Sequence, residues 1–123
     1  MSATAEGWLA RFLQPRFAQL GSKPATIVGR ADTPAADAVC DMHLTLDGQR
    51  IVAIRFAVYG PPVAVACADW LCETATGRTI DAARGLSIQD MEQALALTPE
   101  QRYGALLALD ALANALSQFD LRV

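Results

Sequence analysis

The side chains best suited to metal or sulfur chemistry in this 123-residue sequence are three cysteines and a single histidine. Cys40 is followed directly by Asp41 and then by His43, whereas Cys67 and Cys72 lie close together downstream. Thiolates bind soft metal centres and also carry sulfur as persulfides, so both metal binding and sulfur transfer are open to such residues. The cysteines form no CxxC pair and are odd in number, which favours reduced thiols over a disulfide framework.

Each of these residues also has a structural interpretation. Cys40 alternates with apolar residues at the start of a predicted strand, which favours a core position, yet it remains the best candidate for a reactive thiol. Cys67 falls in a predicted buried helical stripe, and Cys72 lies about 140° around that helix, so the two cannot jointly bind a metal. The polar side chains nearby are expected at the surface: Asp41, His43, Arg55 and Glu73.

The N-terminal part of the sequence predicts one helix followed by an irregular connection. Apolar residues recur at intervals of three and four between Trp8 and Leu20, which predicts an amphipathic helix kinked or split at Pro15. Residues 21–38 mix glycine, proline and small polar residues around a short TIV, so we expect mostly irregular structure there.

From Cys40 the hydrophobic period changes to two, which predicts a β-hairpin. Asp47 and Gly48 form its turn, and residues 51–58 form the second strand. One face of that strand is predicted to carry Val52, Ile54, Phe56 and Val58, with Arg55 on the other.

The rest of the sequence predicts helices. The first covers residues 63–76, with Pro62 in its first turn and Gly77 as its end. Thr79 and Ser87 are predicted N-caps of two short helices, and a final helix opens at the sequence TPEQ, residues 98–101, and runs to about residue 118. The order predicts an α+β fold, a small antiparallel hairpin-based sheet with helices packed on one face. We expect a single domain over residues 1–123, in which residues 1–38 precede a core of residues 39–123.

Composition excludes several functional classes. The net charge is −3, which gives no general attraction to nucleic acid, and no apolar run is long enough to span a membrane. The N-terminus carries no recognisable export signal, so we expect a cytoplasmic protein. The motifs GxGxxG, HExxH and GxSxG and a Walker-type loop are absent, which argues against the common enzyme classes.

Two stretches carry a family resemblance. The sequences DGQRIVAIRFAVYGPPVAVACADWLCETATGRTIDAA and LALTPEQRYGALLALDALANAL resemble the core of the iron–sulfur cluster scaffold family of IscU type, equivalent to the N-terminal domain of NifU. The resemblance covers about residues 39–117. It implies the IscU/SufE-like fold, and a site in which three cysteines and an aspartate or histidine hold a transient iron–sulfur cluster or a zinc ion.

Carried onto this chain, most of that ligand set is lost. The family turn FGC corresponds to the sequence YGP, so Pro61 stands where a cysteine ligand is expected. Tyr103 and Gly104 stand in place of the histidine and the last cysteine. The family triplet CGD falls on residues 38–40, which puts Ala38 at the first cysteine and Cys40 at the aspartate. A shift of two residues would instead place Cys40 at the first cysteine, so at most one thiol remains.

The resemblance also bears on partners. The family's chaperone-binding LPPVK segment keeps Leu97 and Pro99 but has Gln101 in place of lysine, which makes recognition by the dedicated Hsp70 system doubtful. A cysteine desulfurase or another iron–sulfur assembly protein is the expected partner.

Three functions therefore stay open. The first is an accessory or regulatory scaffold-like protein without a resident cofactor, which is not an enzyme. The second is a SufE-like sulfur acceptor that uses Cys40, with Asp41 beside it, as a persulfide carrier. The third is a genuine cluster or zinc protein completed by dimerisation.

Overall fold

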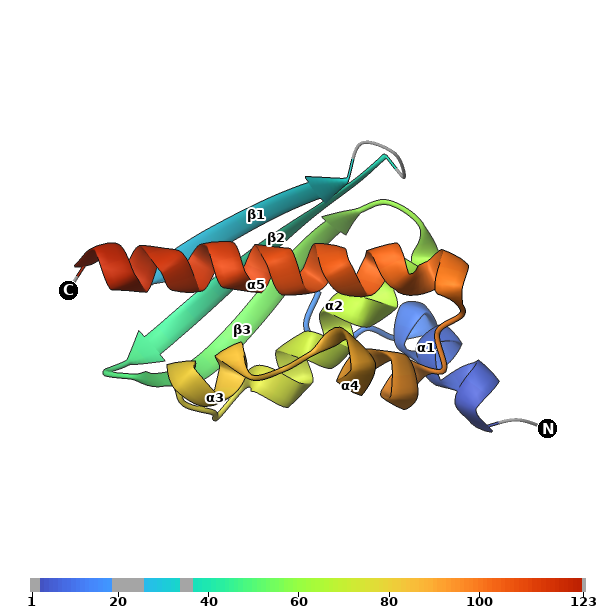
Figure 1. Cartoon of the computed structure of the whole chain (residues 1–123), viewed down its shortest axis with the longest axis horizontal. Coiled ribbons are helices and arrows are strands. Elements are labelled where there is room, and N and C mark those ends of the chain that lie inside the picture. The colour runs from blue at the N-terminus through green and yellow to red at the C-terminus, as the bar shows by residue number, and fades with distance from the viewer. Residues whose placement is uncertain (1–2, 19–25, 34–36, 123) are drawn as a thin grey trace.

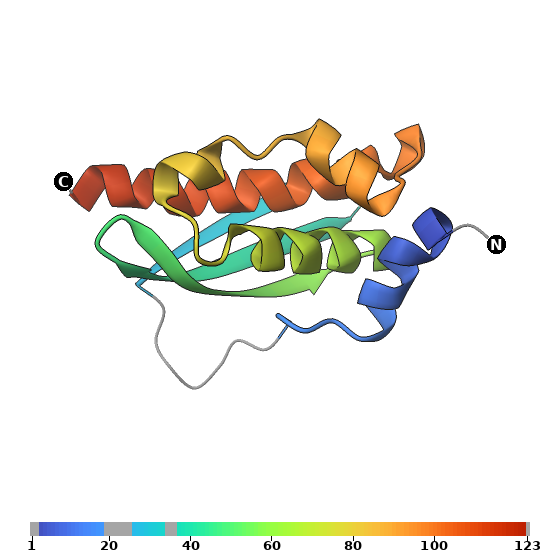
Figure 2. The same cartoon turned by 90° about the horizontal axis from the view of Figure 1, so that it is seen from below.

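The computed structural model describes residues 3–18, 26–33 and 37–122, and Figure 1 shows how their helices and strands are arranged. In chain order the elements are α1 (Ala3–Leu13), β1 (Ile27–Thr33), β2 (Ala38–Asp47), β3 (Arg50–Tyr59), α2 (Pro62–Ala75), α3 (Ile80–Arg84), α4 (Ile88–Leu95), a 3-10 helix (Pro99–Gln101) and α5 (Arg102–Arg122). The strands form an antiparallel sheet of order β1-β2-β3. Figure 2 shows α2 and α5 side by side on one face of this sheet, which confirms the α+β prediction. No helix in the described ranges has the length and apolar character needed to cross a membrane.

Strict alternation along β2 explains how the sheet buries one face. The side chains that point toward α2 and α5 are fully buried, namely Ala38, Cys40, Met42 and Leu44. The intervening side chains lie on the other face, where Arg30 of β1 forms an ion pair with Asp41 at 2.6 Å. The alternation of apolar and polar residues in the sequence thus corresponds to a sheet with one buried face.

Strand β1 corrects the expectation of mostly irregular structure over residues 21–38, of which residues 21–25 and 34–36 lie outside the described residues. Residues 27–33 pair with β2 in a regular antiparallel register in which Gly29 lies opposite Met42. A Cβ on Gly29 would lie 2.2 Å from the backbone nitrogen of Ala115, so only glycine permits α5 to approach this strand. Gly29, which permits this contact with α5, also interrupts the alternation of apolar residues. The sequence pattern therefore does not predict strand β1.

The outer edge of β1 is covered by two side-chain amides of α5. Asn114 Nδ2 donates to the carbonyl oxygen of Arg30 at 2.7 Å, and the Gln118 amide donates to the carbonyl oxygen of Val28. These bonds satisfy backbone acceptors that an edge strand otherwise leaves to solvent.

The predicted hairpin is confirmed, but its second strand contains a bulge. Thr45 pairs with Ala53 and Leu46 pairs with Ile51, which leaves Val52 without a partner on β2. As a consequence Ile51 is completely buried while Val52 is 45% exposed, the reverse of the predicted facing.

The helix predictions hold in most details. The first helix ends at Leu13, ahead of Pro15, instead of continuing toward Leu20, because proline cannot remain in a helix interior. Residues 19 and 20 lie outside the described residues. The predicted N-caps are confirmed by side-chain hydrogen bonds at Thr79 and at Ser87, where a full capping box forms. The last helix extends beyond the expected residue 118 to residue 122.

Candidate functional site

The positions that correspond to the family's ligands meet at one corner of the fold, where β3 leads into α2 and α5 begins (Figure 1). We call this region the corner. It consists of four positions to which the resemblance assigns ligands, together with the residues that contact them: Ala38, Pro61, Tyr103 and Gly104, with Gly60, Ala64 and Cys67. Cys40, the remaining position, lies near Cys67 beside the corner. Ala38 enters from β2, Gly60 and Pro61 form the turn after β3, and the other corner residues come from α2 and α5.

The corner is closed by contacts between small residues. A Cβ on Gly60, whose φ is 157°, would lie only 2.7 Å from the Cβ of Ala38. A Cβ on Gly104 would lie 3.2 Å from Cys67 Sγ and 3.4 Å from the Cα of Ala64. Added side chains at these glycines would meet atoms already in place, so the corner has little room for larger side chains, although Gly60 is exposed and Pro61 is half-buried.

Pro61 contributes backbone geometry where a cysteine ligand is expected. It precedes the first residue of α2 with φ −62° and ψ 157°, and its carbonyl oxygen accepts from the N–H of Ala64 at 3.0 Å. These dihedral angles are those that the proline ring favours. The turn keeps its shape with a residue that has no side-chain donor atom.

All three cysteines are completely buried. Burial raises the pKa of the Cys40 thiol to about 12, with smaller contributions from Asp41 and Cys67. Burial likewise raises the pKa of Cys67 to about 12 and that of Cys72 well above its ordinary value. The thiolate form of cysteine is the nucleophile and the metal ligand. The raised pKa values keep these three thiols protonated, which disfavours both roles. The expectation that Cys40 occupies a core position is confirmed.

The other polar candidates do not converge with the thiols. Asp41 and His43 lie on the opposite face of β2 from Cys40, and the Arg30 guanidinium lowers the pKa of the Asp41 carboxyl through a hydrogen bond. Tyr103 is half-buried, and burial raises the pKa of its hydroxyl. Nowhere in residues 3–18, 26–33 and 37–122 do three histidine, cysteine or acidic side chains come together so as to hold a metal ion. The residues of the corner therefore do not fit the cluster or zinc ion that the resemblance implies.

One charged residue of α2 was overlooked in the sequence. Asp69 is only 1% exposed, and its carboxylate accepts from Arg11 Nη1 at 3.0 Å and from the backbone N–H groups of Arg16 and Phe17. Among the described residues, Asp69 is the one charged residue that is buried. An aspartate within the apolar run VAVACADWLC was the available signal, but its partners are more than 50 residues away in sequence.

Glu73, one turn further along α2, was expected to be a solvated charge and in fact pairs with two arginines. It accepts from Arg11 Nη2 and, at 2.8 Å, from Arg16 Nη2. The hydrogen bond from Arg11 is the largest cause that lowers the pKa of this carboxyl. Asp69 and Glu73 thus bind the N-terminal segment to α2.

Comparison with known proteins decides the family, because the family of NifU-like N-terminal domains matches residues 5–123. The chain belongs to this family. Among its relatives in the NifU-like family, the bifunctional protein NifU/MnmA of Rubrobacter xylanophilus is 35% identical over 95 residues, which cover 75% of this chain and 20% of that protein. The iron–sulfur cluster assembly enzyme IscU of Drosophila melanogaster is 28% identical over 120 residues, or 95% of this chain and 78% of that protein.

Solved structures of NifU-like proteins share the fold. A crystal structure described as an iron–sulfur cluster assembly scaffold protein for the SUF system, from Fervidobacterium islandicum, aligns with a TM-score of 0.76 at 16% identity. The alignment covers 94% of this chain and 96% of that chain. At this level of identity the likeness concerns the fold, which is that of the IscU/NifU-type scaffolds.

Proposed function

We propose that this chain is an accessory or regulatory member of the iron–sulfur cluster assembly machinery, which keeps the scaffold fold and holds no cluster of its own. The observation that carries the proposal is the corner, where Ala38, Pro61 and Gly104 stand at ligand positions and pack against their neighbours. A closed cluster or zinc site needs about four protein donors. The corner offers one buried thiol, Cys67, beside a second, Cys40, and both are protonated at neutral pH.

The expected partner is a cysteine desulfurase or another protein of the same assembly system in the cytoplasm. Family membership supports this choice of system, and the retained sheet and helices supply surfaces on which such a protein can dock. The role is one of binding, and no residue of the corner is assigned a catalytic step.

The two alternative functions both depend on Cys40. A sulfur carrier of SufE type requires an exposed thiol with a low pKa, and Cys40 has no exposed surface and a raised pKa. A cluster shared between two copies requires the same thiol to reach across an interface. The buried position of Cys40 argues against both in this conformation.

The test combines metal analysis with a binding measurement. The full chain is purified anaerobically, its iron, zinc and acid-labile sulfide are quantified, and its binding to a purified cysteine desulfurase is measured by calorimetry. Cys40→Ala is the matched variant, because alanine fits a core position of this size.

We expect substoichiometric metal and sulfide, and equal desulfurase affinity for the wild type and Cys40→Ala. Stoichiometric metal that disappears in Cys40→Ala would overturn the proposal in favour of a genuine cluster or zinc site. Persulfide transfer to Cys40 would establish the sulfur carrier instead. Absence of binding to the desulfurase and to the other assembly proteins would remove the accessory role.

A further inference from the structure

The N-terminal segment lies against α2 and the free edge of β3 (Figure 2). We call residues 3–18, which comprise α1 and the extended residues after it, the strap. From Trp8 to residue 18 no residue of the strap is fully buried: Trp8 and Phe17 are half-buried against the core, and Leu9 and Leu13 are 42% and 66% exposed. By contrast, α2 and α5 each bury a continuous apolar face. A segment with so little buried apolar surface is the kind that opens locally while the rest of a protein stays folded.

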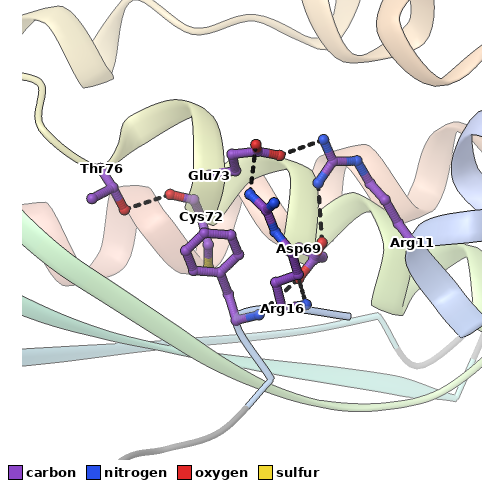
Figure 3. Close-up of polar contacts among 7 residues, drawn as sticks. Arg11, Arg16, Asp69, Cys72, Glu73 and Thr76 are labelled. Carbon is purple, nitrogen blue, oxygen red and sulfur yellow. Dashed lines mark hydrogen bonds and ion pairs between the residues drawn. The ribbon is translucent and has the colours of Figure 1, made fainter. Parts of the chain in front are cut away.

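Polar contacts to a single carboxylate compensate for that weak apolar packing. Figure 3 shows Arg11 and Arg16 directed at Asp69 and Glu73 on one side of α2. Asp69 receives the guanidinium of Arg11 at 3.0 Å, the N–H of Arg16 at 2.7 Å and the N–H of Phe17 at 2.9 Å. Hydrogen bonds to a buried charge are stronger than those between neutral groups, and each of these reaches the strap.

The extended end of the strap covers the edge of β3. The backbone N–H of Phe56 donates to the carbonyl oxygen of Phe17 at 2.9 Å, although Phe17 belongs to no strand of the sheet. The ring of Phe17 is contacted by the guanidinium groups of Arg16 and Arg55, at 5.6 and 5.4 Å from its centroid. The N–H of Phe17 donates to Asp69, so this carboxylate holds the same residue whose carbonyl oxygen closes the strand edge.

We propose that the strap opens and closes as one unit over the edge of β3, and that Asp69 is the residue that holds it closed. The sheet, α2 and α5 remain folded when it opens. Opening releases the N–H of Phe56 from its partner and leaves the carboxylates of Asp69 and Glu73 without their arginines. The strap is therefore a conformational device that controls access to one edge of the sheet.

Native-state hydrogen exchange on the full chain tests this proposal, with Asp69→Asn as the main variant. Asparagine keeps the size of the side chain and removes its charge. The informative amides are those of Phe56, which bonds to Phe17, and Gln14, which bonds to Ala10 inside the strap; neither bonds to Asp69. Gln14 reports on opening because an 11-residue helix that has left α2 does not keep its own hydrogen bonds in water. We expect both to exchange faster by the same factor, roughly 10- to 100-fold, as a charged buried acceptor is lost. Amides of β2 and α5 should retain their wild-type protection.

Arg11→Gln provides a second variant that leaves α2 unchanged, in case Asp69→Asn fails to fold. It should accelerate exchange at the same two amides by a common, smaller factor. Glu100→Gln, an exposed carboxylate outside this network, is the matched charge control and should have no effect. An equal loss of protection in β2 and α5 would show that the strap opens only when the whole domain unfolds, which would overturn the proposal. A change confined to Arg16 and Phe17 would show that Asp69 holds only its direct partners.

Discussion

Two regions of α2 differ in a way that the family resemblance does not predict. Its first two turns contribute Ala64 and Cys67 to the corner, where neutral small residues pack within van der Waals distance of Gly104. Its next turns carry Asp69 and Glu73, which bind two arginines of the strap. The part of the helix next to the expected ligands is apolar and closed, whereas the part without a motif holds the buried charge. Small residues thus pack closely at positions to which the resemblance assigns metal ligands.

The largest effect expected from this comparison concerns thiol reactivity. With pKa values of about 12, Cys40 and Cys67 should be alkylated at pH 8 about 10³-fold more slowly than an ordinary cysteine, because thiolate is scarce and access is blocked. Mass spectrometry of the native protein after timed exposure to iodoacetamide measures the rate at each site. The protein in denaturant is the control. A thiol that reacts as fast in the native state as in denaturant would mean that the corner is open.

The buried charge of α2 should dominate the stability of that region. Asp69→Ala leaves two backbone N–H groups without their acceptor and Arg11 with Glu73 as its remaining partner, so we expect the free energy of unfolding to fall by about 3 kcal/mol. Glu73→Ala removes a half-exposed carboxylate and should cost about 1 kcal/mol or less. Urea denaturation followed by circular dichroism measures both. Equal losses for the two variants would contradict the distinction drawn between buried and exposed charge.

Restoring a thiol to the corner should destabilise the protein modestly. In Gly104→Cys the added Cβ lies 3.2 Å from Cys67 Sγ, and overpacking of this kind costs about 1–3 kcal/mol. Replacing a helical glycine by cysteine returns only about 0.3 kcal/mol, because cysteine is itself a poor helix former, so a net loss of about 1–2 kcal/mol is expected in urea denaturation. Ala113→Cys, at an exposed position of α5, controls for the thiol itself. A Gly104→Cys protein more stable than the wild type would show that the corner has spare room.

The smallest effect is a dependence on pH at Glu73. Its folded-state pKa is below the ordinary value of 4.5, chiefly because of Arg11, so its contribution is complete above that value and is lost as pH falls through the lowered pKa. Because the carboxylate is 39% exposed, the contribution should be about 0.5 kcal/mol. The stability difference between the wild type and Glu73→Gln, measured in urea at pH 7 and pH 3, should shrink at pH 3. A difference that grows on acidification would have the wrong sign.

The elements that could be predicted from sequence are those whose own residues carry the signal. The hairpin follows from alternation that begins at Cys40, and the short helices follow from their caps at Thr79 and Ser87. Strand β1 was missed because Gly29, which admits α5, interrupts the apolar pattern. The sequence predicts the wrong buried side chain at residues 51 and 52, because a β-bulge adds one residue to β3 and no residue type indicates it.

The candidate site shows the same division. The loss of ligands at Pro61 and Gly104 stays a prediction, which depends on the role that the resemblance gives to each position. The burial of Asp69 could not be predicted, because it depends on Arg11 and on backbone groups brought from a distant part of the chain. A charge within an apolar helix indicates that a partner exists without saying where it is.

The amides of Asn114 and Gln118 on the β1 edge have a consequence for how copies of this protein behave in concentrated solution. An uncovered edge strand presents backbone acceptors to the edge strand of a neighbouring molecule, and the two sheets can then join edge to edge. Here the carbonyl oxygens of Val28 and Arg30 are already occupied by side chains of the same chain. A second copy must first displace those two amides, so α5 protects the molecule against the intermolecular sheet growth that begins aggregation.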